Sequence, residues 1–303
     1  MSYVLQTVNL SKKYKKKAAV DQVSLNVERG EIYGFIGKNG AGKSTFIRLV
    51  AGLAKKNSGE IRLFENDNLD IQRRKIGTMI ENPGVYPNLT AKQNLHHYCL
   101  LLGLDPEPTV ESMLSLVGLN NTGKKKVKNF SLGMKQRMAI AIALMDDPEF
   151  LMLDEPINGL DPAGIREIRE LILKLNKEKG ITILISSHIL GELSKIATCY
   201  GVINDGKLVD EFTKEELKAR CVEMLEITVD NTEKAVEILK QNLSINEDKI
   251  KTINHKTINI ADSLDRAGQI NTELAKNGIT IMASTIIGQD LEDYFMKLME
   301  QTI

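Results

Sequence analysis

The chain has 303 residues, of which 42% are hydrophobic and 26% charged, a composition typical of a folded protein with a sizeable core. Its longest apolar runs fall far short of the roughly 20 residues that a membrane-spanning helix needs, and no signal-peptide pattern opens the chain, so we expect a cytoplasmic protein. The formal net charge is zero and the three cysteines lack ligand spacing, which argues against nucleic-acid binding and against a zinc site.

Short apolar runs alternate with helical periodicity through residues 2–212, which predicts an α/β domain with a covered sheet. We expect strands of this domain at residues 31–37, 150–155 and 181–187. Residues 91–147 are expected to form a mostly helical insertion. A further apolar stripe at helical spacing predicts a helix that begins with Asp161 as its cap and Pro162 in its first turn.

The stretch GKNGAGKST follows the first of these strands and precedes a helical run. Its glycines let backbone N–H groups curl around phosphate oxygens, and the following helix turns its positive end toward the same anion. Lys43 would neutralise the β and γ phosphates, and the Ser44 hydroxyl would ligate Mg²⁺. The sequence therefore predicts an ATP-binding loop of nine residues: Gly37, Lys38, Asn39, Gly40, Ala41, Gly42, Lys43, Ser44 and Thr45.

Two acids end the strand in FLMLDEP. We expect Asp154 to reach Mg²⁺ and Glu155 to act as the base that deprotonates the attacking water. His188, after the next strand, is expected to bridge the γ phosphate and Glu155. Two acids at a strand end can form an ordinary solvated loop, and a lone histidine is more often structural than catalytic. The phosphate loop upstream favours the catalytic interpretation.

The phosphate loop, the acid pair and the histidine are followed or accompanied by two further motifs, NFSLGMKQR and NGLDP. Together these motifs resemble those of the ABC ATPases, and the resemblance covers residues 2–212. The resemblance implies a P-loop fold with a helical subdomain, a D-loop at Asp161 and an adenine-stacking aromatic at Tyr14. It also implies a signature loop made of Ser131, Leu132, Gly133 and Met134, in which Leu132 and Met134 depart from the usual glycine and glutamine. It further implies a head-to-tail dimer whose signature loops close over the γ phosphate bound by the other subunit.

Glu81 stands where most ABC ATPases have a glutamine that contacts Mg²⁺. A carboxylate is the stronger ligand, so we expect a tighter dependence on the metal; the alternative is drift at a tolerant loop position. Glu81, YPNLT and SLGMKQR resemble the exporter branch that protects bacteria against bacitracin and lantibiotics. That resemblance implies a separate multi-span membrane permease, a position on the cytoplasmic face of the cell membrane, and a second copy or a homologous ATP-binding subunit as partner.

Residues 213–303 differ from the rest in charge and in pattern. Residues 1–212 hold 29 Lys and Arg against 24 acids, and the remainder holds 11 against 16. The order strand, helix, hairpin, helix, strand and final helix predicts a small α+β domain, which we expect to support a dimer or to regulate the ATPase. Two alternatives to peptide export stay open: export of another drug or lipid, and a soluble ABC ATPase that acts on ribosomes or DNA.

Overall fold

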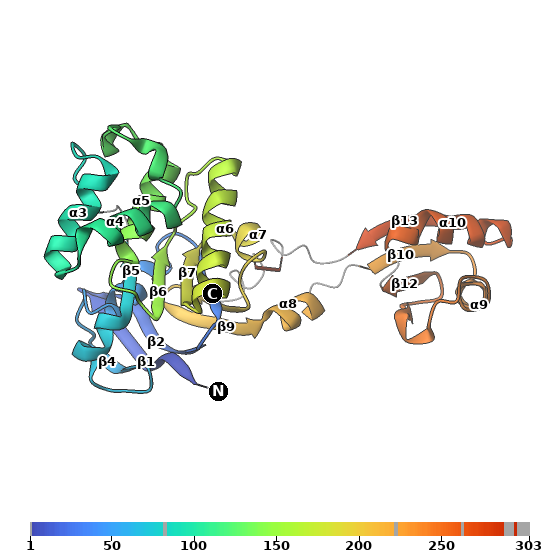
Figure 1. Cartoon of the computed structure of the whole chain (residues 1–303). Helices are drawn as coiled ribbons and strands as arrows, with labels where there is room; N and C mark the ends of the chain where they lie inside the picture. The colour runs from blue at the N-terminus through green and yellow to red at the C-terminus, as the bar shows by residue number, and fades with distance from the viewer. Residues whose placement is uncertain (1, 81–83, 221–223, 262–263, 288–293, 296–303) are drawn as a thin grey trace. The chain divides into compact units, whose positions relative to one another are not determined.

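The computed structural model describes residues 2–80, 84–220, 224–261, 264–287 and 294–295. They form two compact units, which divide between Lys214 and Glu215 (Figure 1). The amino-terminal unit contains every residue to which the sequence assigns a part in nucleotide chemistry. The carboxy-terminal unit has a separate hydrophobic core.

A six-stranded sheet in the order β5-β6-β7-β3-β8-β9 forms the centre of the amino-terminal unit. Its strands are β3 Ile32–Ile36, β5 Ile76–Met79, β6 Phe150–Asp154, β7 Thr182–Ser187, β8 Cys199–Asn204 and β9 Lys207–Thr213. Neighbours are parallel except β8 and β9. Every residue of β3, β6 and β7 is buried, as in a sheet covered on both faces, which confirms the three predicted strands. Because β6, β7 and β3 are parallel neighbours, their carboxyl ends lie together at the same end of the sheet.

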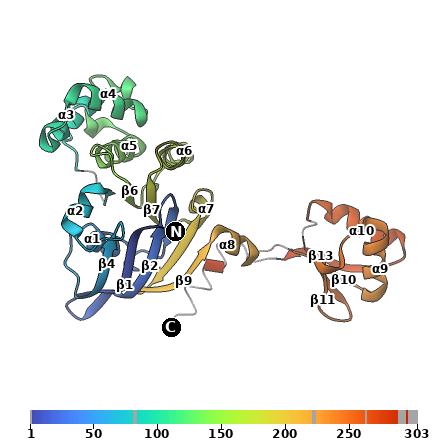
Figure 2. The same ribbon diagram turned by 60° about the horizontal axis from the view of Figure 1, so that its bottom comes forward.

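A second, antiparallel sheet in the order β2-β1-β4 was not anticipated from the sequence. Its strands are β1 Tyr3–Tyr14, β2 Lys17–Glu28 and β4 Ser58–Leu63 (Figure 2). β1 and β2 are interrupted by several register shifts, which weaken the period-two alternation that identifies a strand. Helix α1, Lys43–Val50, shares one buried core with β1, β2, β4 and β6, so the helix that follows the phosphate loop is packed against both sheets.

The predicted helical insertion contains three helices, which lie together in both views (Figures 1 and 2). Besides α1, the helices of this unit are α2 Leu69–Gln72, α3 Ala91–Leu102, α4 Pro106–Leu116, α5 Leu132–Ala143, α6 Pro162–Lys179 and α7 Leu190–Leu193, and α8 Lys214–Arg220 begins at the boundary between the units. Three 3-10 turns, Arg73–Lys75, Asn120–Thr122 and Val127–Asn129, join them. Asp161 Oδ1 accepts a hydrogen bond from Gly164 N at 3.0 Å, which confirms the predicted cap of α6.

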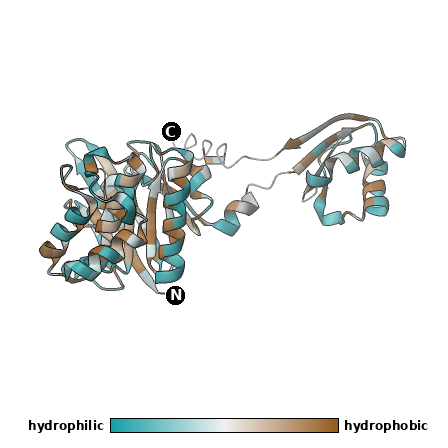
Figure 3. Ribbon diagram, turned by 45° about the horizontal axis from the view of Figure 1, so that its top comes forward, coloured by the Kyte–Doolittle hydropathy of each residue, from teal (hydrophilic) through white to brown (hydrophobic). Residues whose placement is uncertain are grey.

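The carboxy-terminal unit is an antiparallel sheet with two helices, in the predicted order strand, helix, hairpin, helix and strand. Its elements are β10 Met224–Val229, α9 Thr232–Leu243, a 3-10 turn Glu247–Lys249, β11 Ile250–Thr252, β12 Thr257–Ala261, a 3-10 turn Leu264–Arg266, α10 Ala267–Lys276 and β13 Ile281–Ile287. The strand order is β11-β12-β10-β13. Hydrophobic and hydrophilic residues alternate along its helices (Figure 3), and the apolar side chains of both helices share one core with the sheet. Most of the expected final helix lies outside the described residues.

Candidate functional site

The phosphate loop joins the carboxyl end of β3 to the start of α1. A Cβ atom at Gly37 would lie 2.3 Å from Ile203 O, and one at Gly42 would lie 2.3 Å from Ala19 O, so close packing requires glycine at both positions. A Cβ atom at Gly40 would meet nothing within 4 Å, so glycine is favoured at this position only because φ is +84°. The loop is therefore a closely packed, glycine-dependent backbone cradle of the type that binds phosphate.

The other residues of the loop surround the start of α1. The Lys38 side chain is exposed. Ser44 and Thr45 stand in the first turn of α1, where backbone N–H groups have no helical acceptor and the helix dipole is positive. Lys43 is 5% exposed, and its ammonium donates to Gly37 O at 2.6 Å and to Lys38 O at 3.2 Å. The loop and its lysine thus form one packed structure.

Asp154 and Glu155 lie at the carboxyl end of β6, beside the end of β7. The Ser186 hydroxyl donates to Asp154 Oδ1 at 2.5 Å and accepts from Glu155 N at 2.9 Å. Asp154 is 5% exposed and Ser186 fully buried. Gly37 N donates to Ser187 O at 3.3 Å, which ties the start of the phosphate loop to the next residue of β7. Sequence reasoning missed Ser186; the signal was a pair of serines at the end of a buried strand, directly before His188.

Glu155 links the phosphate loop to His188. Its Oε1 lies 3.1 Å from Lys43 Nζ, and its Oε2 lies 2.9 Å from His188 Nδ1. Oε1 is buried in this ion pair with the ammonium, which also donates to the Gly37 and Lys38 carbonyls. The backbone φ of Glu155 is +50°, a left-handed conformation that costs a non-glycine residue about 1 kcal/mol or more and that clusters at functional sites. One carboxylate oxygen is therefore held by His188, and the other lies beside the Lys43 ammonium.

The predicted signature residues form a second hollow of about 430 Å³, which they share with the loop that contains Asp161. Ser131 caps α5, because its hydroxyl accepts from Met134 N at 3.3 Å. Leu132 is 45% exposed, and a Cβ atom at Gly159 would lie 3.2 Å from its Cδ2. A Cβ atom at Gly133 would meet nothing closer than 3.8 Å, so packing within the described chain does not demand a glycine there. The residues that line this hollow do not include those of the phosphate loop.

Tyr14 and Glu81 are the remaining predicted residues. Tyr14 ends β1 with its ring 48% exposed, and Lys12 Nζ lies 4.9 Å from the ring centroid. The strand that pairs with it, β2, supplies the Ala19 carbonyl that backs Gly42. Glu81 lies outside the described residues.

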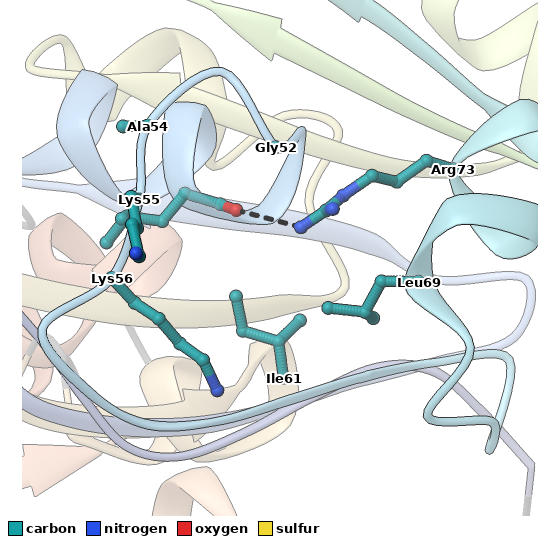
Figure 4. Close-up of a pocket in the computed structure, with 8 residues that line it drawn as sticks. Gly52, Ala54, Lys55, Lys56, Ile61, Leu69 and Arg73 are labelled. Atoms are coloured by element: carbon teal, nitrogen blue, oxygen red, sulfur yellow. Dashed lines mark hydrogen bonds between the residues drawn. The ribbon is translucent and has the colours of Figure 1, made fainter.

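Helix α1 is also fixed at its carboxyl end, beside a different hollow (Figure 4). Arg73 donates from Nε to Val50 O at 3.0 Å and from Nη2 to Leu49 O at 3.4 Å, and so bonds the last carbonyls of the helix. A Cβ atom at Gly52 would lie 2.8 Å from the guanidinium. Arg73 thus holds the phosphate-loop helix in position.

An ion-pair cluster supports the segment that follows His188. Glu192 of α7 lies 2.8 Å from Arg169 Nη1 on α6 and 2.5 Å from Lys195 Nζ. The hydrogen bond from Lys195 lowers the pKa of Glu192 below its ordinary value, and Arg169 adds to the effect. The cluster joins the turn after the histidine to the long helix α6.

No helix in the described part of the chain is both long and apolar enough to cross a membrane. Over the same ranges, no group of three or more His, Cys, Asp or Glu side chains is placed to hold a metal ion. A Mg²⁺ ion bound beside a nucleotide needs only one or two protein oxygens, since phosphates and waters complete its octahedron. The hydroxyl of Ser44 and the carboxylate of Asp154 are hard oxygen donors of that kind.

Comparison with known proteins gives the same architecture. The family described as "ABC transporter" matches residues 20–158. The bacitracin transport ATP-binding protein BcrA of Bacillus licheniformis is 42% identical over 301 residues, 98% of both chains. The lantibiotic transport ATP-binding protein SrtF of Streptococcus pyogenes is 46% identical over 69% of this chain and 90% of its own.

A solved structure extends the comparison to three dimensions. The ATP-binding cassette MJ0796, a dimer in a post-hydrolysis state bound to ADP and Pi, has a TM-score of 0.62 at 27% identity, and the match covers 69% of this chain and 98% of that one. Together with the motif geometry, these similarities establish that the chain belongs to the ABC transporter family, as an ATP-hydrolysing, ATP-binding subunit.

Proposed function

We propose that the chain drives the export of an antimicrobial peptide of the bacitracin or lantibiotic type, and so confers resistance or immunity. The observation that carries the proposal is the similarity to the bacitracin transport protein over 98% of both chains, which includes the carboxy-terminal unit as well as the ATPase motifs. The shorter similarity to a lantibiotic transport protein supports the same class of cargo.

In this proposal ATP binds to the phosphate loop at residues 37–45. The backbone cradle holds the phosphates, Lys43 neutralises their charge, and Tyr14 stacks on the adenine. Ser44 and Asp154 would hold Mg²⁺, which when bound offsets the negative charge of the β and γ phosphates. Ser186 keeps Asp154 in position through the 2.5 Å hydrogen bond to Oδ1, and Glu81 is assigned to the same ion from the sequence.

Glu155 is proposed as the general base. Its buried Oε1 lies beside the phosphate loop, 3.1 Å from Lys43 Nζ, where it would accept a proton from the attacking water. His188 holds the other oxygen at 2.9 Å. Glu155 N donates to Ser186 Oγ at 2.9 Å and to Ser186 O at 3.2 Å, which fixes the backbone. Because His188 and Ser186 already fix the side chain and the backbone of Glu155, little conformational entropy is lost when Glu155 reaches the geometry of the transition state.

The signature hollow is proposed as the second half of a composite site. One chain carries the phosphate loop and the signature loop in separate places, so a head-to-tail pair brings Ser131 and Gly133 of one subunit to the γ phosphate of the other. The open space around Gly133 fits a contact from outside the chain. Asp161, as the cap of α6, positions the loop that borders this contact.

A separate membrane permease is the proposed partner, and the cytoplasmic face of the membrane the proposed location. The segment at 84–90 is held against α3, where Asn94 Nδ2 donates to Tyr86 O at 3.1 Å and Tyr98 donates to Gly84 O. The same helix exposes three consecutive leucines, Leu100, Leu101 and Leu102, at 61%, 71% and 43%. An ordered loop beside a helix with exposed apolar side chains suits the docking of a helix from another subunit.

The test is to purify the tagged chain from membranes in mild detergent, identify bound proteins, and measure ATP hydrolysis of the complex with and without bacitracin or a lantibiotic. A co-purified multi-span membrane protein and a peptide-dependent rate are the expected results, with the Lys43→Ala chain as the inactive control. A permease without any peptide effect would limit the proposal to export of another drug or lipid. Ribosomal proteins or DNA in place of a permease would overturn it.

A further inference from the structure

Lys12 lies against the Tyr14 ring at the end of β1. Its Nζ atom lies over the ring, 4.9 Å from the centroid, a separation at which an ammonium is attracted to the electrons of an aromatic face. The same Nζ donates to Lys55 O at 2.6 Å, and Lys55 belongs to the loop that follows α1 (Figure 4). One ammonium thus connects the tyrosine ring with the loop at the carboxyl end of the phosphate-loop helix.

Hydrogen bonds tie the same loop to β1 and to α1. Lys13 N donates to Asn57 Oδ1 at 2.8 Å, and Asn57 N donates to Ser11 O at 2.9 Å. On the other side, Ala54 N donates at 3.1 Å to Arg48 O in the last turn of the helix. The end of β1 is therefore attached to α1, and the lysine ammonium extends this attachment to the tyrosine side chain.

Much of the Tyr14 surface is accessible to a ligand. The residue is 48% exposed, and in the parts of the chain that the structure describes no aromatic ring stacks on it. Strand β2, which pairs with Tyr14 at Lys17, supplies the Ala19 carbonyl that backs Gly42. The hairpin that carries the ring therefore also packs against the phosphate cradle.

We propose that Lys12 positions Tyr14 for ATP: the ammonium holds one face of the ring, and the adenine stacks on the opposite face. This role depends on the proposed stacking of Tyr14 on the adenine. An exposed tyrosine otherwise exchanges among several rotamers, and a ring that is already held loses less conformational entropy when the base binds. Lys12 thus increases the affinity for the base and not for the phosphates, because its ammonium is bound to the ring and to Lys55 O.

The first experiment measures the dissociation constants of ADP and of pyrophosphate for the full chain by calorimetry with Mg²⁺ present. Both probes have two phosphates, but only ADP has the base. Lys12→Met keeps the length of the side chain without its charge, and should weaken ADP binding about two- to fivefold while pyrophosphate binding stays unchanged. Lys12→Arg should bind ADP as the parent chain does. Lys16→Met removes the same charge from the exposed turn of the hairpin and should change neither constant.

Two results would overturn the role of Lys12. The first is an unchanged ADP affinity in Lys12→Met, and the second is an equal loss for ADP and pyrophosphate, which would mean that the lysine acts on the phosphates or on the fold. Since pyrophosphate needs only the cradle, its unchanged affinity also shows that the variant is folded.

A double-mutant cycle with Tyr14→Ala separates this role from the proposed function. Tyr14→Ala alone should weaken ADP binding at least fivefold, as expected for loss of a base stacked on an aromatic ring. In that background Lys12→Met should cause no further loss. If Tyr14→Ala binds ADP normally, the proposed stacking fails and the role of Lys12 fails with it. If Tyr14→Ala weakens ADP and Lys12→Met costs the same with or without the ring, only the role of Lys12 fails.

Discussion

His188 Nδ1 lies 2.9 Å from Glu155 Oε2, although 32 residues separate the two along the chain. The contact exists because β6 and β7 are parallel neighbours whose carboxyl ends meet, with Asp154 in register with Ser186. Glu155 follows the first strand and His188 follows the second. The sheet thus brings two separate motifs into contact, and the Glu155 carboxylate lies between His188 and Lys43.

Replacement of Glu155 by glutamine should lower the rate of ATP hydrolysis by about 10²- to 10⁴-fold, the usual contribution of a general base. ATP binding should persist and a closed dimer accumulate, because the amide keeps the size of the side chain. Phosphate release and ATP-dependent sedimentation measure these effects. Glu149→Gln, at the other end of β6, is the matched control and should hydrolyse normally. A parental rate in Glu155→Gln would refute the assignment of the base.

Ser186→Ala should slow hydrolysis at least tenfold, or about 1.4 kcal/mol in activation free energy, while ATP affinity changes little. The substitution leaves Asp154 Oδ1 and Glu155 N each without its hydroxyl partner, and should also cost about 1–3 kcal/mol of unfolding free energy. Ser187→Ala removes a neighbouring buried hydroxyl that bonds Ile189 instead. Equal turnover in the two variants would show that Ser186 contributes only to stability.

Gly40→Ala and Gly30→Ala form a matched pair. Both glycines have φ near +85°, and a Cβ atom at either would meet nothing within 4 Å. The strain should therefore be similar, about 1–2 kcal/mol of unfolding free energy measured in urea. Only Gly40→Ala should weaken ATP binding, because only that residue lies in the phosphate cradle. Equal ATP affinities, measured by calorimetry, would place Gly40 outside the site.

Glu192→Gln should destabilise the chain at neutral pH and not in acid. Because its ion pairs hold the pKa of Glu192 below the unfolded value of about 4.3, their stabilisation is present above that pH and is lost as pH falls through the folded pKa. The loss at pH near 7 should stay below about 1 kcal/mol, as for other accessible pairs. Urea unfolding at several pH values tests this, with the exposed Glu178 on α6 as the control position. A difference that grows in acid would contradict the assigned sign.

Glu81→Gln should keep most of the ATPase activity and raise the Mg²⁺ concentration that gives half-maximal rate, because an amide oxygen binds the ion more weakly than a carboxylate. The measurement is a Mg²⁺ titration at fixed ATP. The conservative Glu81→Asp variant, which retains the charge, serves as control. An unchanged titration would favour drift at this position.

The local motifs were predictable because they depend on residues that are close in sequence. The phosphate loop needs a strand, glycines at set spacing and a helix, and all of these lie between residues 31 and 50. The cap of α6 needs only Asp161, Pro162 and an apolar stripe. The three buried strands were visible as apolar runs because a covered parallel sheet requires apolar side chains on both faces.

Several contacts between segments that are distant in the sequence could not be predicted from local patterns. Ser186 resembles any serine at the end of a strand until the register of β6 and β7 places it against Asp154. The long strands β1 and β2 escaped prediction because bulges shift their alternation. Likewise, the sequence of β13 shows a neutral strand, but only the order of the sheet makes it an edge.

The sequence by itself determined that this protein binds and hydrolyses ATP, because the chemistry depends on residue types at short, fixed spacing. The sequence also predicted the contact of His188 with Glu155, but only the tertiary structure placed Lys43 beside the same carboxylate and Ser186 against Asp154. The physical reason is that strand order and register are set by the burial of side chains from the whole chain, which no single motif contains.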